Sequence, residues 1–121
     1  MKSPNYKIVL SLLSLSLSIF ADVKPAVLFI DGMVIQRDIQ APIWGKAAPG
    51  EKVVVTGSWG ESEQTVADNK GKWLVKIQTP HAGGPHRLTI KGSNSVEIKD
   101  VLSGEVWLCS GQSNMAYRLN N

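Results

Sequence analysis

The sequence predicts a mainly β chain: an antiparallel, jelly-roll-like β-sandwich followed by the first strand, turn and helix of an α/β domain. Two observations predict the sandwich, since turn signals recur at short intervals and apolar residues alternate with polar ones between them. A third predicts the second domain, because near residue 101 the alternation gives way to a continuous apolar run. We therefore expect a leader at 1–21, the sandwich at 22–100 and the opening of an α/β domain at 101–121.

The first 21 residues have the pattern of a secretory signal peptide. Lys2 and Lys7 make the start basic, a 13-residue stretch rich in Leu, Ile and Val follows from Ile8 to Phe20, and Ala21 is small. The alternative is an amphipathic strand, because Leu and Ser alternate over 10–18. No run of about 20 apolar residues occurs, so we expect no membrane span. The expected location is secreted or periplasmic.

The distribution of charge argues against a nucleic-acid partner. The formal net charge is +3, but from residue 22 onward 11 basic residues stand against 10 acidic ones. A protein that neutralises several phosphates needs a stripe of basic residues, and the sequence contains none.

Five clusters of turn-forming residues divide the region from 22 to 104. They are Ala48–Gly50, Asp68–Gly71, Ala82–Pro85, Gly92–Asn94 and Ser103–Gly104. Between them apolar residues recur at every second position, which places them on one face of a strand. These apolar positions are Val53, Val55, Trp73, Val75, Ile77, Leu88, Ile90, Val96 and Ile98. No segment of 23–100 keeps a helical period, so this region is predicted to be all β.

The pattern changes after Asp100. The apolar run Val106–Cys109 predicts a strand buried on both faces, as in a parallel sheet. A polar turn follows at 110–114, and a helix could start over 115–119. Strand, turn and helix in this order are typical of the start of an α/β domain.

Ser113 is the candidate nucleophile. A serine at the carboxyl end of a buried strand, on a sharp turn into a helix, is exposed on one side, and its backbone N–H can stabilise an oxyanion. Gly111 leaves room for such a turn. The alternative is that Ser113 caps the helix. The turn also departs from the α/β-hydrolase elbow, because Met115 stands where that motif has its second glycine.

A nucleophilic serine needs a base and a group that orients the base. The chain has two histidines, His81 and His86, in one turn and outside any Asp-x-x-His pattern, so no base can be assigned. We expect both to be solvated loop residues; a metal site is the alternative, but no further ligands accompany them. We expect neither a metal nor a cofactor. Cys109, the single cysteine, is expected to be a small buried residue rather than a nucleophile.

Four tryptophans could pack in the core or stack on a sugar. We expect core packing for Trp73 and Trp107, because each lies in an apolar strand. Trp44 and Trp59 precede glycines near strand ends, so the preference for core packing is weaker there and sugar stacking stays open.

The 16 residues Asp100–Met115 closely resemble the nucleophile block of the sialate O-acetylesterase family, which belongs to the SGNH hydrolases. Four upstream segments resemble that family's N-terminal β domain in the same order: Asp31–Arg37, Pro42–Gly45, Pro49–Glu51 and Ala82–Pro85. The likeness covers roughly 25–117. It departs from the family at Ala116–Tyr117, where an acidic or amide residue is common, and at His86, where an aromatic residue is common.

The resemblance implies an exported esterase that removes O-acetyl groups from a sugar. The serine that matches Ser113 attacks the acetyl carbonyl, and its backbone N–H helps to hold the oxyanion. The remaining oxyanion donors and the Asp-x-x-His pair belong to blocks with no counterpart in residues 1–121, so we expect an N-terminal fragment without activity of its own. Those donors are a Gly and an Asn of later blocks; Asn114 belongs to the first block and does not take the role of that Asn.

Two other functions stay open. Within the same chemistry, an acetylated plant polysaccharide such as xylan is an alternative substrate. In a different class, the β domain is a non-catalytic module that binds sugar or braces a neighbouring domain.

Overall fold

The computed structural model describes residues 21–111, which form eight β-strands and no helix. The strands are β1 (Lys24–Pro25), β2 (Val34–Gln36), β3 (Gln40–Lys46), β4 (Lys52–Gly57), β5 (Ser62–Val66), β6 (Lys72–Gln78), β7 (Gly83–Lys91) and β8 (Ser95–Gly104). The predicted mainly β fold is therefore confirmed. Of the leader expected over 1–21, all but Ala21 lies outside the described residues, and so does the helix expected after residue 114. Residues 21–111 contain no helix with the length and apolarity that a membrane span requires.

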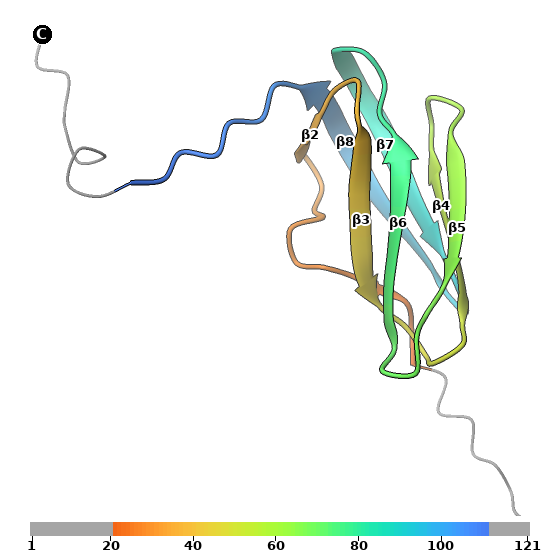
Figure 1. Ribbon diagram of the computed structural model, residues 1–121. Helices are drawn as coiled ribbons and strands as arrows, with labels where there is room; N and C mark the ends of the chain where they lie inside the picture. Colours follow the sequence, from red (N-terminus) through yellow and green to blue (C-terminus); the bar gives the residue numbers. More distant parts are fainter. Residues whose placement is uncertain (1–20, 112–121) are drawn as a thin grey trace, which may run out of the picture.

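The strands form two sheets that face each other (Figure 1). One has the order β1-β3-β6 and the other the order β2-β8-β7-β4-β5. In Figure 1, β3 and β6 lie in front of β7 and β8. All strand pairs are antiparallel except β2 and β8, which run parallel. The sandwich is thus almost, but not wholly, the antiparallel one that the sequence predicts.

The apolar residues that alternate along the strands form the core between the sheets. Ile77 of β6 and Leu88 and Ile90 of β7 are completely buried, as are Val53 and Val55 of β4. Burying a side chain of this size stabilises the fold by roughly 1.5–3 kcal/mol. The predicted inner faces of these strands are therefore confirmed.

The carboxylate of Glu51 joins two turns at one end of the sandwich. It accepts a hydrogen bond from the backbone N–H of Ala48 at 2.9 Å and another from that of Ser93. The bond from Ser93 is the main reason why the pKa of Glu51 is lowered, and burial opposes it. Beside Ser93, Asn94 accepts a hydrogen bond from the backbone N–H of Val23 at 2.6 Å, which ties the start of the domain to the same turn.

Strand β8 runs past the boundary expected near residue 101 and through the turn expected at Ser103–Gly104. Ser103 pairs with Ile35 of β2, and Gly104 pairs with Gln36. The Ser103 hydroxyl also donates a 2.8 Å hydrogen bond to the Pro80 carbonyl. This pairing satisfies the backbone and overrides the turn preference of the two residues, so the sandwich extends to Gly104.

The turn expected at Ala82–Pro85 is instead the irregular start of β7. The strand begins at Gly83, and its register against β8 shifts between Gly83 and His86 and again between His86 and Leu88. A bulge of this kind lets a strand continue through residues that would otherwise end it.

Replacing Leu88 should destabilise the domain far more than replacing an exposed leucine. We expect Leu88→Ala to lower the free energy of unfolding by about 2–5 kcal/mol, because it leaves a cavity in the core. Leu74→Ala is the matched control, since Leu74 lies in β6 with 53% of its surface exposed, and should cost less than about 1 kcal/mol. Equilibrium unfolding in urea measures both values. Equal losses would contradict the core described here.

Candidate functional site

The predicted nucleophile Ser113 lies outside the described residues. The structure describes the segment that leads to it, residues 105–111, which contains neither strand nor helix. Figure 1 shows this segment running away from the sandwich after β8. The strand expected over Val106–Cys109 is therefore not formed in the described residues.

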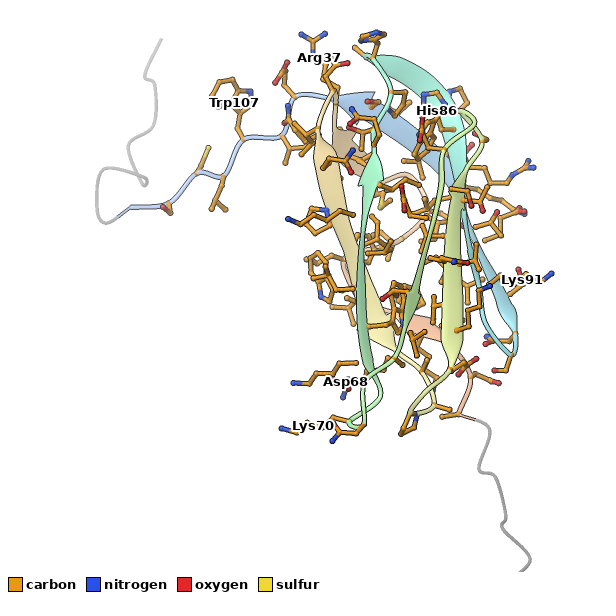
Figure 2. The ribbon with its side chains drawn as sticks, turned by 45° about the vertical axis from the view of Figure 1, so that its right-hand side comes forward. Arg37, Asp68, Lys70, His86, Lys91 and Trp107 are labelled. Carbon is orange, nitrogen blue, oxygen red and sulfur yellow. The ribbon has the colours of Figure 1, made fainter. Side chains whose placement is uncertain are left out.

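Two predictions about this segment are wrong for the described structure. Cys109 is exposed rather than buried. Trp107 is 82% exposed rather than packed in a core, and Figure 2 shows it on the extended segment, away from the strands. An apolar strand is buried only by the strands and helices that pack against it. Residues 21–111 provide none of these around 105–111, so its apolar side chains meet solvent.

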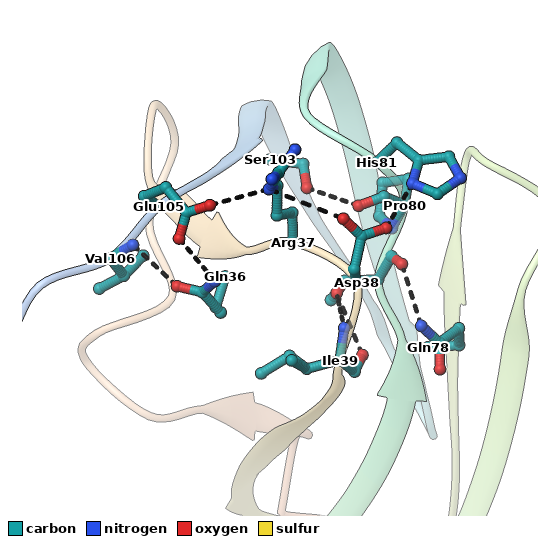
Figure 3. A network of polar contacts seen from close by, with 11 residues as sticks. Gln36, Arg37, Asp38, Ile39, Gln78, Pro80, His81, Ser103, Glu105 and Val106 are labelled. Atoms are coloured by element: carbon teal, nitrogen blue, oxygen red, sulfur yellow. Dashed lines mark hydrogen bonds and ion pairs between the residues drawn. The ribbon is translucent and has the colours of Figure 1, made fainter.

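A network of polar contacts holds the point at which the chain leaves the sandwich (Figure 3). The Glu105 carboxylate accepts hydrogen bonds from Arg37 Nε at 2.9 Å and from Gln36 Nε2 at 3.1 Å. Gln36 Oε1 accepts a 2.8 Å bond from the backbone N–H of Val106. The backbone N–H of Arg37 donates to the Gly104 carbonyl at 3.0 Å. The end of β2 thus fixes the direction of the three residues after Ser103.

These contacts lower the pKa of Glu105 below its usual value of 4.5. The largest cause is the hydrogen bond from the Gln36 side chain, followed by the bond from Arg37, while desolvation opposes them. Because Glu105 and Arg37 are both exposed, water screens their attraction. The network therefore positions the chain more than it stabilises the fold.

Asp38 extends the network to His81. The Asp38 carboxylate contacts His81 Nδ1 through one oxygen, and its other oxygen lies 3.6 Å from Arg37 Nε. A carboxylate at the Nδ1 of an imidazole is the arrangement that orients a general base. The sequence did not reveal this pair, because Asp38 and His81 are distant in the chain. His81 is 95% exposed, in agreement with the predicted solvated loop residue.

His86 is not the solvated loop residue that the sequence predicts. It lies in β7, is half-buried, and packs edge-on against Trp59, with ring centroids 5.5 Å apart. Trp59 is fixed in turn, because its indole N–H donates a 2.8 Å hydrogen bond to the Gln78 carbonyl. His86 is therefore a packing residue of β7. Within residues 21–111, no three His, Cys, Asp or Glu side chains gather closely enough to hold a metal ion.

The remaining tryptophans differ in their exposure. Trp73 is buried, which confirms its predicted place in the core. Trp44 is 37% exposed on the outer face of β3, and Phe29 packs edge-on against it with ring centroids 4.9 Å apart. Of the tryptophans in β-strands, Trp44 is thus the one whose indole is accessible to a ligand.

The chain is similar to one part of known carbohydrate esterases. A solved structure of a novel carbohydrate acetylesterase from Xanthomonas citri superposes with a TM-score of 0.71 and 37% identity, over 78% of this chain and 22% of that one. Two sialate O-acetylesterases are also 37% identical: the mouse protein over 99 residues and the human protein over 94. These alignments cover 72% and 69% of this chain. The chain belongs to the sialate O-acetylesterase family.

The extent of this relationship is limited to one part of the relatives. The chain spans 18% of the length of the mouse and human proteins. It matches no protein-family profile.

Removing the Gln36 side chain should raise the pKa of Glu105. Because its pKa is lowered in the folded protein, the contacts of Glu105 stabilise the folded state at neutral pH, and this stabilisation is lost as the pH falls through that pKa. In Gln36→Leu, this stabilisation should begin to be lost at a higher pH than in the unsubstituted protein. Carboxyl carbon shifts in an NMR titration measure this. Gln40→Leu is the matched control, since Gln40 donates to Gln78 in the other sheet. An unchanged titration of Glu105 in Gln36→Leu would refute the assignment.

Proposed function

We propose that the protein is a carbohydrate O-acetylesterase with Ser113 as its nucleophile. The observation that carries this proposal is the 37% identity to sialate O-acetylesterases over most of the chain. The resemblance of residues 100–115 to the nucleophile block of that family supports the choice of Ser113.

In the proposed reaction, the Ser113 hydroxyl adds to the carbonyl carbon of the acetyl ester. The backbone N–H of Ser113 donates to the oxyanion that forms, and a base takes the hydroxyl proton. The bond between the acetyl carbon and the sugar oxygen then breaks, the protonated base gives its proton to that oxygen, and the sugar leaves as an alcohol while acetyl-serine remains. Water hydrolyses this second ester, which releases acetate and restores the serine.

The substrate is proposed to be an O-acetylated sialic acid, as the names of the relatives indicate. Acetylated xylan is the alternative, because the name of the structural relative, a carbohydrate acetylesterase, does not specify the sugar. The pattern of residues 1–21 supports export to a secreted or periplasmic location, where such glycans are met. A β domain that only binds sugar or braces its neighbour is the alternative from another class.

Ser113→Ala should abolish acetate release by the natural gene product. We expect a loss of roughly a thousand-fold or more, because no other group forms the acyl intermediate. Ser110→Ala is the matched control, since Ser110 belongs to the same block and should leave most of the activity intact. O-acetylated sialosides and acetylated xylan, assayed in parallel, identify the substrate. Full activity in Ser113→Ala would refute the nucleophile, and sugar binding without hydrolysis would favour the binding module.

The 121-residue chain by itself should not hydrolyse a chromogenic acetyl ester. The Asp-x-x-His pair of the family has no counterpart in its sequence, and the Asp38–His81 contact lies in open solvent. Turnover that disappears in Ser113→Ala would overturn this expectation. His81→Ala would then decide whether the Asp38–His81 pair serves as the base.

A further inference from the structure

The outer face of the smaller sheet carries a hollow of about 680 Å³. It is bounded by β1 and the residues after it, by the second half of β3, and by the start of β6 together with the turn before it. Cavities of 300–1,000 Å³ are typical of sites for small ligands. The hollow therefore has room for a sugar unit, and its lining indicates which kind.

Three lysines form a row across this hollow. Lys24 of β1 pairs with Lys46 of β3, and Lys46 pairs with Lys72 of β6. All three are exposed, and none takes part in the ion pairs found within residues 21–111. Like charges directly opposite one another on a sheet repel. A bound anion would relieve this repulsion.

The acidic residue in the lining does not neutralise that row. Asp68 uses Oδ1 to accept hydrogen bonds from the backbone N–H groups of Lys70 and Lys72, at 2.9 and 2.8 Å. Figure 2 shows Asp68 and Lys70 at the end of the sandwich, where this turn lies. The carboxylate is thus held by the turn, and one carboxylate against three ammonium groups leaves the lining with an excess of positive charge.

An apolar row lies directly beside the lysines. Trp44 is two residues from Lys46 on the same face of β3, and it pairs with Leu74 of β6. Both side chains are exposed, and the ring of Phe29 holds the indole from one edge. A rigid, partly exposed indole offers an apolar surface to the C–H face of a sugar ring. The cationic and apolar rows together match a sugar ring that carries an acidic group.

We propose that this hollow is a binding site for a carboxylate-bearing sugar, either a sialic acid or a uronic acid. The sugar ring packs on Trp44 and Leu74, and its carboxylate lies among the ammonium groups of Lys24, Lys46 and Lys72. This site rests on the proposed function, which makes a carbohydrate the substrate, and it extends that function by selecting acidic glycans. The site lies on the sandwich, on residues distinct from Ser113, so its role is to hold the glycan rather than to cleave it.

Calorimetric titration of the 121-residue chain tests the site. The probes are sialyl-lactose, a glucuronate-substituted xylo-oligosaccharide, and their neutral counterparts lactose and unsubstituted xylo-oligosaccharide. We expect at least one acidic probe to bind about 10-fold or more tightly than its neutral counterpart, because each charge-assisted hydrogen bond contributes strongly. The preference should shrink as salt is added. The probe that binds identifies the acidic sugar.

Substitutions then test what the lysine row and the apolar row each contribute to binding. Lys46→Gln should reduce the preference for the acidic probe several-fold, and Trp44→Ala should weaken binding of the same probe. Lys91→Gln is the matched control, because Lys91 is exposed on β7 of the other sheet and points outward (Figure 2). Trp107→Ala controls for the loss of an exposed indole. Urea unfolding verifies that each variant stays folded.

Equal affinity for acidic and neutral probes would overturn the site, and so would a preference that Lys46→Gln does not reduce. Absence of binding to every probe would overturn it as well. None of these results bears on the esterase, which is tested separately by acetate release in Ser113→Ala. If Ser113→Ala loses acetate release but no probe binds to the hollow, the proposed esterase function stands and only the sugar site is refuted.

Discussion

The apolar layer between the two sheets determines what each strand presents to solvent. Because side chains alternate along a strand, burial of Ile43 in β3 turns Trp44 outward, and burial of Val75 in β6 turns Leu74 outward. The register of β3 against β6 then sets Trp44 beside Leu74. A shift of one residue would bring the outer side chains into the core, so the packing that stabilises the domain also fixes its outer surface.

The chain leaves this sandwich at a point defined by polar contacts. β2 pairs with the last residues of β8, and Gln36 at its end and Arg37 just after it then hold Glu105. Such exposed contacts contribute little to stability. Their effect is geometric, because they set the direction in which the segment toward Ser113 begins. Asp38 and His81 meet at the same end of the domain, where the backbone N–H of Asp38 donates to the Pro80 carbonyl at 3.3 Å.

Local patterns predicted the strands well and the ends of strands less well. Turn-forming residues at 48–50, 68–71 and 92–94 do connect strands. Ser103 and Gly104 do not, because β2 pairs with them, and this parallel pairing joins segments far apart in the sequence. His86 was misjudged for a related reason. Its flanking glycines and prolines indicate a loop, yet the contact with Trp59 and the pairing with β8 draw it into β7.

The sequence by itself determined the mainly β fold, the inner faces of the strands and the resemblance to an esterase family, because alternation and short motifs depend on neighbouring residues. Only the tertiary structure decided where β8 ends, that Asp38 meets His81, and that three lysines share one row. Each of these depends on which strands pair and in what register. Pairing and register are set by the packing of the whole sandwich, which no single segment contains.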